Sequence, residues 1–464
     1  MTGWHPDLSR SASPRYMAIA ELIEIDLSEG RLVTGERLPP QRQLAERLGL
    51  DFTTVARGYA EAARRGLVQS HVGRGTFVTN PRERMVAEAV PSDPQRAAPA
   101  DFSMNMPPEP EDPALLARMR EGLAVLAADL PALLRYQIFG GSALDRQAAA
   151  LWLARRGMKP APERIFVTPG AHAGLLAILA VLARPGDTIL CECITYPGIR
   201  SLATQATLSL HGLPMDDRGV LPDAFDTACR DRKPKALYLN PTLQNPLTLT
   251  VPESRRREIA AIAARHGVPV IEDDAYGFVP PDAPPPFAAL LPELTWHVGG
   301  LSKCLGAGLR LAYVTAPDAK SAWPFVSALR ATAVMASPLT SALATRWIGD
   351  GTADAILTGI RRETVARQAL AAAALPPESY RADPLSFNIW LPLGNGWTRS
   401  TFVSHMRACG LGVVASDAFT VEGTAPEAAR VCLGGPVSRD ALRHALDFMA
   451  HALDGSPERA ASFF

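Results

Sequence analysis

The amino-acid sequence predicts an α/β protein with a mostly parallel sheet, preceded by a small N-terminal domain that contains a winged helix-turn-helix. From about residue 114, apolar strand-like segments alternate with Ala- and Leu-rich helical segments, a pattern typical of α/β layers. Residues 15–79 instead show helical periodicity that ends in a Gly-punctuated stretch. Residues 81–113 are dense in Pro, Ala and charged side chains. We therefore expect a first domain at 1–80, a linker at 81–113 and a second domain at 114–464.

Composition narrows the classes of protein. Lys and Arg number 47 and Asp and Glu also 47, so no global basic field attracts nucleic acid, although a local DNA-binding face is compatible with this balance. The six Cys form no C-x-x-C pair, which predicts neither a metal site nor a disulfide framework. The first residues lack the apolar core of a signal peptide, and the longest apolar run, 173–183, is too short to span a bilayer. We expect a cytoplasmic protein with free thiols and no membrane segment.

The first domain is predicted to contain two short helices joined by a tight turn. Residues 16–30 carry apolar side chains at helical spacing. A Pro-Pro pair then opens a second helix, which Gly49 ends, and Asp51 caps a third helix that runs to Gly66. The second and third helices, joined by the tight turn, form a helix-turn-helix, in which the later helix enters the major groove of DNA. From periodicity alone, a small helical domain that binds protein is an equal alternative.

Residues 36–78 resemble the GntR-type winged helix along their whole length. The resemblance implies that side chains of the helix-turn-helix and of the wing contact bases and phosphates: Arg42, Thr53, Thr54, Arg57 and, in the wing, Arg74. The sequence departs from the family at Pro40, which replaces a Ser, and at Asp51-Phe52, which replace Ser-Arg. The departures remove a phosphate or guanine contact and add repulsion, so we expect DNA binding with an atypical sequence preference.

The second domain carries the groups that pyridoxal phosphate chemistry requires. These are an amine for the aldimine, an acid for the pyridine nitrogen, hydrogen bonds to the phenolic oxygen, a flat group against the ring, and donors for the phosphate. Lys303 is the candidate amine, because the apolar runs on both sides would bury it and a buried Lys loses its proton readily. A solvated surface Lys is the alternative. Arg310, seven residues later, is a fixed cation for the phosphate.

The candidate acid lies in a cluster at the end of an apolar strand. Asp273 stands where α/β sheets place ligand-binding groups, although a turn or helix cap is the alternative role. Glu272 and Asp274 are adjacent, and composition does not choose among the three.

The candidate phosphate site is a helix that begins with Gly. Gly170, Ala171 and His172 follow an apolar strand, and a helix N-terminus attracts anions. Many strand-to-helix turns look like this one, so the signal is weak by itself. Tyr196 is the candidate flat group, although a single Tyr is more often part of a core.

From about residue 101 to 453 the chain resembles fold-type I, pyridoxal phosphate-dependent aminotransferases. The resemblance rests on residues 167–171, 185–187, 195–198, 244–246, 272–276 and 302–303. It implies that Asp273 partners the pyridine nitrogen, and that Tyr276 and Asn245 bond the phenolic oxygen. It also includes Ser302 in the cofactor site, beside Lys303.

The same resemblance implies two further groups. Arg430 matches the Arg that binds a substrate carboxylate, with a surface Arg as the alternative, and Tyr136 matches the Tyr that reaches the phosphate of the partner subunit in a homodimer. Gly300 replaces a phosphate-binding Ser, and Asn-Pro-Leu-Thr replaces Asn-Pro-Thr-Gly at 245–248. We therefore expect a looser hold on the phosphate.

A GntR-type winged helix, a linker and an aminotransferase-like body in this order resemble the MocR subfamily of bacterial transcription regulators. The resemblance implies a homodimeric regulator that binds DNA, holds pyridoxal phosphate and senses an amine or amino acid by aldimine exchange at Lys303. A working aminotransferase with an accessory winged helix is the alternative, since the catalytic set is intact. A sensor of pyridoxal phosphate itself is a third hypothesis, and it would not need Arg430. The sequence leaves the effector, the operator and the direction of regulation open.

Overall fold

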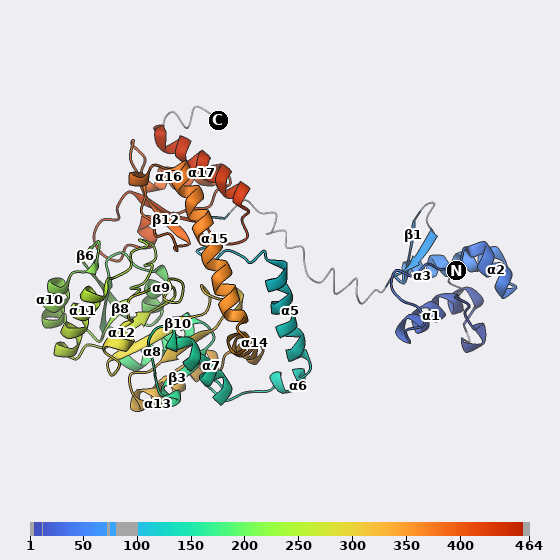
Figure 1. The fold of residues 1–464 in the computed structure, drawn as a ribbon, viewed down its shortest axis with the longest axis horizontal. Coiled ribbons are helices and arrows are strands. Elements are labelled where there is room, and N and C mark those ends of the chain that lie inside the picture. The colour runs from blue at the N-terminus through green and yellow to red at the C-terminus, as the bar shows by residue number, and fades with distance from the viewer. Residues whose placement is uncertain (1–3, 12, 72–74, 80–100, 458–464) are drawn as a thin grey trace. The chain divides into compact units, whose positions relative to one another are not determined.

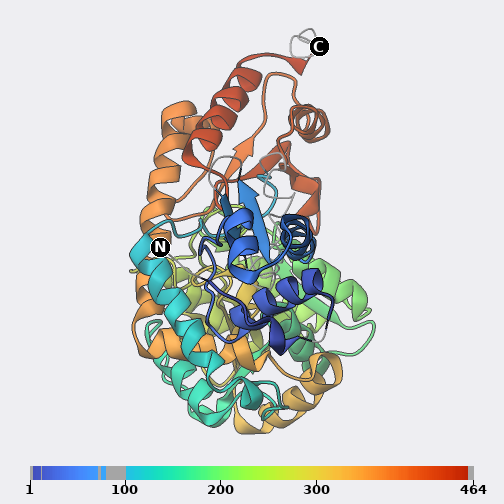
Figure 2. The same ribbon diagram turned by 90° about the vertical axis from the view of Figure 1, so that its right-hand side faces the viewer.

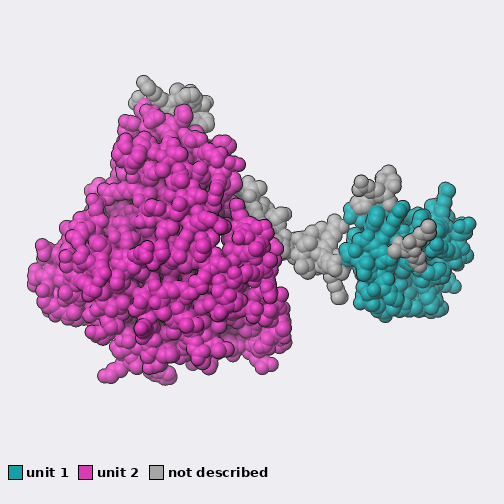
Figure 3. Space-filling model, viewed as in Figure 1, with its two compact units in different colours: residues 1–98 teal, residues 99–464 magenta. Residues whose placement is uncertain are grey.

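The structure, a computed structural model of the 464-residue chain, describes residues 4–11, 13–71, 75–79 and 101–457. The chain forms two compact units, residues 1–98 and 99–464, which are described separately (Figures 1 and 3).

Within its described residues, the first unit has three helices followed by a two-stranded antiparallel hairpin. Its elements are a short helical turn, η1 (Leu8–Arg10), then α1 (Arg15–Ser28), α2 (Gln41–Leu48), α3 (Phe52–Arg64), β1 (Val68–His71) and β2 (Gly75–Val78). α2 ends at Gly49, whose φ of 60° is left-handed. α3 begins after Asp51, whose carboxylate accepts a hydrogen bond from the Thr53 amide. The predicted helix-turn-helix is confirmed, and Arg74 lies outside the described residues.

The core of the first unit forms where α1 crosses α3. Ile19, Leu22 and Ile23 have no exposed surface, as their helical spacing predicts. Gly58 of α3 lies directly against α1, because a Cβ there would be 2.9 Å from the Cβ of Ile19. Tyr59, one residue later, donates from its hydroxyl to the Pro39 carbonyl at 2.8 Å. This bond ties α3 to the residues that precede α2.

The second unit is built on a seven-stranded sheet within residues 101–457. In spatial order the strands are β3 (Ile165–Thr168), β11 (Ala312–Thr315), β10 (Thr295–Gly300), β9 (Val270–Asp273), β8 (Ala236–Leu239), β4 (Thr188–Glu192) and β5 (Ser209–Leu213). Neighbours from β10 to β5 are parallel, whereas β11 is antiparallel to both of its neighbours. The predicted mostly parallel sheet is confirmed, with one reversed strand.

Helices cover both faces of this sheet (Figure 1). The helices of this part of the chain are α5 (Pro113–Ala127), α6 (Leu130–Leu133), α7 (Ala143–Ala154), α8 (Ala171–Leu182), α9 (Pro197–Gln205), α10 (Pro222–Arg232), α11 (Glu253–His266), α12 (Phe287–Leu290), α13 (Ala319–Ala333) and α14 (Pro338–Gly349). Of these, α5 packs against α14. Short elements are η3 (Pro162–Arg164), η4 (Ala307–Leu309) and the hairpin of β6 (Met215–Asp216) and β7 (Gly219–Val220). No helix in the described part of the chain is long and apolar enough to cross a membrane.

Alternation along β3 shows why both faces need cover. Ile165 and Val167 join one apolar cluster, which includes Trp152 of α7 and Trp347 of α14. Phe166, between them, joins a second cluster, to which α8 and α13 contribute. Successive strand residues point to opposite faces, so an apolar strand of this kind requires a helix layer on each side.

A smaller C-terminal part completes the second unit. It consists of α15 (Thr352–Ala374), η5 (Pro377–Ser379), α16 (Arg399–Ala408), η6 (Ser416–Ala418), α17 (Arg439–Asp454) and an antiparallel sheet in the order β12 (Asn388–Pro392), β14 (Ala428–Cys432), β13 (Val414–Ala415). Figures 1 and 2 show α16 and α17 together at one end of this unit. β14, the middle strand, carries Arg430.

Residues 101–112 pack into the second unit, although the sequence assigns them to the linker. Phe102 has no exposed surface, and its carbonyl accepts a hydrogen bond from the Cys432 amide at 2.9 Å. Asp101 and Pro108 form bridges to the backbone of Gly412 and Gly435. The composition of the segment is that of a linker, but one aromatic anchor and backbone pairing bury it. The body therefore begins about a dozen residues earlier than predicted.

Candidate functional site

The C-terminal ends of five parallel strands meet at one cavity of about 380 Å³. The residues that follow β3, β4, β8, β9 and β10 line it, together with β14 and residues 103–106. Open α/β sheets bind ligands at this edge. Most of the predicted cofactor and effector residues lie in the lining: Ala171, His172, Tyr196, Asn245, Asp273, Tyr276, Ser302, Lys303, Arg310 and Arg430.

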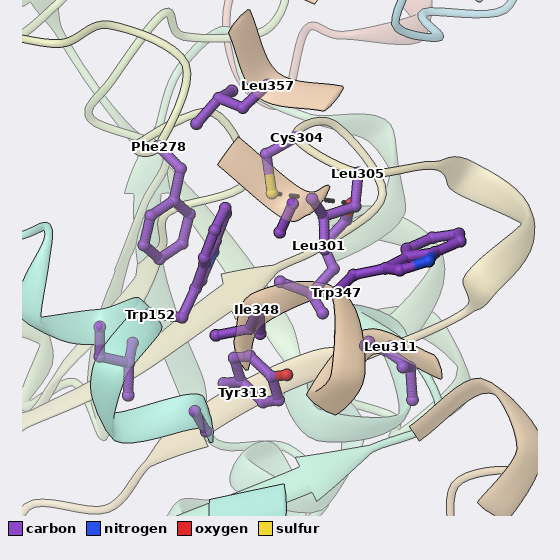
Figure 4. Close-up of a cluster of buried hydrophobic side chains, with 14 of the residues drawn as sticks. Trp152, Phe278, Leu301, Cys304, Leu305, Leu311, Tyr313, Trp347, Ile348 and Leu357 are labelled. Carbon is purple, nitrogen blue, oxygen red and sulfur yellow. Dashed lines mark hydrogen bonds between the residues drawn. The ribbon is translucent and has the colours of Figure 1, made fainter. Parts of the chain in front are cut away.

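Lys303 is held by its neighbours in the chain. It lies three residues after the end of β10, and its chain neighbours Leu301, Cys304 and Leu305 are buried in an apolar cluster (Figure 4). The side chain of Lys303 is half-buried, and its amine donates a hydrogen bond to the carbonyl of Asn105. Burial lowers the pKa of this amine to about 8, because a dry environment disfavours the ammonium form.

Among the three adjacent acids, Asp273 alone lines the cavity. Its Oδ2 accepts a hydrogen bond from the Tyr238 hydroxyl at 2.8 Å, and burial raises the pKa of its carboxyl to about 6. Glu272 instead accepts hydrogen bonds from the backbone amides at the start of α12, at 2.9 and 3.0 Å. Asp274 pairs with Arg156 at 2.9 Å and contacts His297 at 3.2 Å. Glu272 and Asp274 thus have structural partners, while Asp273 faces the site.

Arg430 connects three parts of the second unit. From β14 its Nη1 donates to Asn245 Oδ1 at 2.8 Å, and its Nη2 donates to the Ser103 carbonyl. Its guanidinium carbon lies 4.8 Å from the centroid of the Phe419 ring, at cation–π distance. Because the Asn245 amide accepts through its oxygen, its NH₂ group remains available as a donor.

The expected phosphate end gathers around the start of α8. Gly170 has a φ of 86°, a backbone conformation that favours glycine, and it lies against the guanidinium of Arg310, whose Nη2 would be 2.9 Å from a Cβ at this position. His172 Nε2 lies 2.8 Å from the Tyr196 hydroxyl, at hydrogen-bond distance. Burial, followed by the charge of Arg310, lowers the pKa of His172. Gly198 makes room for this pair, since a Cβ there would be 2.2 Å from the Tyr196 ring.

Three residues that line this cavity each have one buried polar atom without a hydrogen-bond partner among the described residues. These atoms are an acid oxygen, Asp273 Oδ1; a guanidinium donor, Arg430 Nε; and an amide oxygen, Asn105 Oδ1. Buried polar groups are normally bonded, and an unbonded one costs free energy. An acid, a cation and a reactive amine at one cavity fit a ligand with a basic nitrogen, an acid group and an aldehyde.

Several residues that line the cavity, among them Ser103 and Asn105, were missed from the sequence, and two predicted cofactor residues, Gly170 and Tyr136, are not part of its lining. Ser103 and Asn105 contact Arg430 and Lys303 through their carbonyls, but they lie in a segment that resembles a linker. No sequence signal identifies a backbone carbonyl as a contact. Tyr136 does not line the cavity of its own chain and is 82% exposed.

Four of the predicted DNA-contacting residues lie on α2 and α3 of the helix-turn-helix. Arg42 of α2 and Thr53 and Arg57 of α3 are exposed, and Thr54 is half-buried. The Arg57 guanidinium lies 4.4 Å from the centroid of the Tyr16 ring, which orients it. The Thr53 hydroxyl donates to the Asp51 carboxylate, so this Thr also belongs to the helix cap.

Comparison with known proteins identifies two families in the chain. Residues 15–78 match the gntR family of bacterial regulatory proteins, and residues 100–447 match aminotransferase class I and II. The uncharacterized HTH-type transcriptional regulator YdeF of Bacillus subtilis is 28% identical over 452 residues, which cover 97% of this chain and 97% of YdeF. The HTH-type pyridoxine biosynthesis transcriptional regulator PdxR of Corynebacterium glutamicum is 28% identical over 314 residues, or 64% of this chain and 65% of PdxR. The HTH-type regulator TauR of Rhodobacter capsulatus is 28% identical over 346 residues, or 68% and 69%.

Solved structures share the fold of the second unit. The α-aminoadipate aminotransferase LysN of Thermus thermophilus superposes with a TM-score of 0.69 at 20% identity, covering 83% of this chain and all of LysN. An archaeal alanine:glyoxylate aminotransferase gives a TM-score of 0.70 at 20% identity, covering 87% and 99%. Fold and site thus define a helix-turn-helix domain fused to a fold-type I aminotransferase body. The chain belongs to the aminotransferase class I and II family, and with its gntR domain it is an HTH-type transcriptional regulator of the MocR type.

Proposed function

We propose that this chain is a pyridoxal phosphate-dependent regulator that binds DNA through α2 and α3 and senses an amine or amino acid at Lys303. The observation that carries the proposal is the convergence of Lys303, Asp273 and Arg430 on one cavity of a chain that also has a gntR domain. A reactive amine, a partnerless acid oxygen and a partnerless cationic donor are what a cofactor and an acidic effector together require.

The cofactor proposal rests on the fit of the surrounding side chains. Pyridoxal phosphate, when bound, supplies an aldehyde that condenses with amines and a pyridine ring that withdraws electrons. Asp273 Oδ1 is a free acceptor for the pyridine nitrogen, and the Tyr238 bond holds this carboxylate in place. Ala171, His172, Ser302 and Arg310 offer donors and positive charge to a phosphate at the start of α8, beside Gly170. Tyr196 offers a flat face.

The effector proposal rests on Lys303 and Arg430. With pyridoxal phosphate bound, Lys303 would be the amine that an incoming amine displaces, and its pKa of about 8 leaves about one tenth of the free side chain neutral at pH 7. Arg430 keeps an unpaired Nε donor at the cavity, which favours an effector with a carboxylate or sulfonate.

DNA binding follows from the helix-turn-helix class, and the exposed groups on α2 and α3 support the contacts. Arg42 reaches solvent in the first turn of α2, where DNA-reading helices present side chains, and Arg57 reaches solvent from the middle of α3. Ten Arg and nine acidic residues in 1–80 nearly cancel, so the position of these two Arg matters more than net charge.

A homodimer is supported by exposed apolar side chains on the second unit. Residues along α6, the loop after it and α7 are large, apolar and solvent-facing: Leu130, Leu134, Tyr136, Ile138, Leu144 and Leu151. Soluble monomers rarely expose so many together. A second copy on this face would bury them and bring Tyr136 toward the partner's cavity.

Catalytic turnover is the second candidate function. It is favoured by the completeness of the amine, the acid and the cation at one cavity, because this set also suffices for transamination. The regulatory proposal instead expects binding without sustained turnover.

Absorbance spectroscopy tests the cofactor proposal. Full-length protein with pyridoxal phosphate should show a visible band that Lys303→Ala lacks and Lys320→Ala, a matched surface change, retains. A wild type without the band would refute the proposal. Multiple turnovers with an amino acid and a keto acid would favour the aminotransferase instead.

An electrophoretic shift tests the DNA proposal. Arg42→Ala combined with Arg57→Ala should abolish binding to the DNA that flanks the gene. Arg64→Ala removes one positive charge from the far end of α3, where Arg64 already pairs with Glu61, and should bind normally. Retention of binding by the double variant would show that another surface contacts DNA.

A further inference from the structure

Residues 101–106, which we call the entry segment, are the first described residues after 80–100 and lead directly into the cavity. Buried contacts hold the segment in place. Phe102 is fully buried and pairs with Cys432, two residues beyond Arg430 on β14. The Met106 carbonyl lies so close to Gly434 that a Cβ on residue 434 would be only 1.8 Å from the carbonyl oxygen. A segment fixed in this way cannot shift without moving its contacts to the cavity.

Two carbonyls of the entry segment bind the two functional cations. Arg430 Nη2 donates to the Ser103 carbonyl, and Lys303 Nζ donates to the Asn105 carbonyl. These are the groups that the proposed function assigns to the effector's acid and to amine exchange. Any ligand that engages Lys303 or Arg430 therefore competes with the backbone of the entry segment.

The Asn105 side chain fixes the segment to the same site. It is 7% exposed, and its Nδ2 donates to the Tyr276 hydroxyl at 2.9 Å and to Asn388 Oδ1 at 3.0 Å. Asn105 lines the cavity, and its Oδ1 is buried without a hydrogen-bond partner among the described residues. One residue thus touches Lys303 by its backbone, contacts a predicted cofactor residue by its amide, and keeps a free acceptor for a ligand donor.

We propose that Asn105 is a positioning residue, and that through it the entry segment reports occupancy of the cavity to the chain that leads toward the DNA-binding domain. This inference rests on the proposed function. With pyridoxal phosphate bound, an incoming amine would form a carbon–nitrogen bond to the cofactor's aldehyde carbon, and the bond from that carbon to Lys303 would break. Two protons would pass from the incoming amine to the nitrogen of Lys303. Lys303 then leaves as a free amine, whose N–H groups bond the Asn105 carbonyl. When Lys303 is bound to the cofactor, it has fewer N–H groups to donate and the carbonyl loses its strong partner.

The consequence is a difference in free energy of the entry segment between the two states of the site. A ligand shifts a conformational equilibrium only through contacts that differ between its states. Here the differing contacts are the two carbonyl bonds and the Asn105 side chain.

Hydrogen–deuterium exchange of the full-length chain tests the link to Lys303. In cofactor-free protein, Lys303→Ala removes the amine that donates to the Asn105 carbonyl, so hydrogen exchange in peptides covering 101–106 should rise. Lys320→Ala should leave this exchange unchanged. Pyridoxal phosphate should raise the same exchange in wild type but not in Lys303→Ala. Unchanged exchange in Lys303→Ala overturns the inference. Absence of the visible band refutes the proposed function separately, because the cofactor-free comparison still stands.

DNA affinity with and without pyridoxal phosphate tests the role of Asn105. We expect wild type to show a coupling within the usual range of about 5- to 150-fold. Asn105→Ala should bring this ratio toward one, and so should Asn105→Asp, which keeps the volume but loses both Nδ2 donors. Glu109→Ala, an exposed change just beyond the segment, should keep the wild-type ratio. A wild-type ratio of one overturns the relay, and a preserved ratio in both Asn105 variants overturns its assignment to this residue.

Discussion

The first and second units place their candidate binding groups in different environments. Arg42, Thr53 and Arg57 are exposed on helices of the small unit, whereas Asp273 and Arg430 are only 3% and 6% exposed in the body. An exposed cation acts through water and is screened by salt, so each contact contributes separately and modestly. Buried groups share partners, and removal of one leaves others unpaired. Single changes should therefore have large effects in the body and small effects in the DNA-binding unit.

The largest effect is expected from Asp273→Asn. The change keeps the shape and the Tyr238 contact but removes the charge that pairs with a protonated pyridine nitrogen. A hydrogen bond to a charged group contributes about 1.5–3 kcal/mol, so the dissociation constant of pyridoxal phosphate should rise about 10- to 150-fold. Titration of the visible band measures it. Asp447→Asn, an exposed change on α17, is the control, and equal affinities of the two variants would remove Asp273 from the cofactor site.

The next effect is the pH dependence of cofactor association. Burial disfavours the charged form of Lys303, which brings its pKa down to about 8. The reactive neutral amine therefore increases about tenfold per pH unit below 8 and levels off above it. Stopped-flow absorbance between pH 6 and 10 should show this plateau. A rate that rises steadily to pH 10 would indicate a solvent-like lysine.

A smaller effect, a gain in affinity for pyridoxal phosphate, is expected from Gly300→Ser. This change adds the hydroxyl of the phosphate-binding Ser that Gly300 replaces. A Cβ at Gly300 meets only Ala171 and Ala275, both at 3.9 Å, so the side chain fits. One added hydrogen bond contributes about 1 kcal/mol, which corresponds to about fivefold tighter binding of pyridoxal phosphate.

Gly299→Ser provides the matched contrast for this gain. A Cβ there meets His297 at 3.2 Å and Phe278 at 3.3 Å, so this variant should lose thermal stability instead. If Gly300→Ser instead weakens the binding of pyridoxal phosphate, the phosphate does not lie beside residue 300.

The smallest effect is expected from Asp51→Asn in the DNA-binding unit. Asn also caps helices well, so α3 should remain intact, while one repulsive charge beside the DNA phosphates disappears. We expect DNA affinity to increase about twofold at moderate salt and the gain to shrink as salt rises. Fluorescence anisotropy at two salt concentrations measures both. A loss of affinity would mean that Asp51 contacts DNA directly.

Local motifs carried most of the successful predictions. The helix-turn-helix depends on contiguous signals, namely Gly49, Asp51 and the stripe of Ile19, Leu22 and Ile23. The apolar strands of the body were visible for the same reason, since an alternating or continuous apolar run is a property of neighbouring residues. Lys303 and Asp273 were recognisable because each lies at the end of such a strand, and strand ends meet at one edge of a parallel sheet.

By itself, the sequence determined the two domains, the mostly parallel sheet and the residue types at the cavity. Composition left three adjacent acids open, and the family resemblance pointed to Asp273. The tertiary structure shows why only Asp273 lines the cavity, because hydrogen bonds from α12 and from Arg156 occupy the other two acids. It also reversed β11, since residues 301–311 between β10 and β11 are too few for the helical crossover that a parallel neighbour needs. Above all, it brought the Asn105 carbonyl to Lys303 across 198 positions of the chain. A backbone carbonyl is the same in every residue, so its partner is set by folding alone.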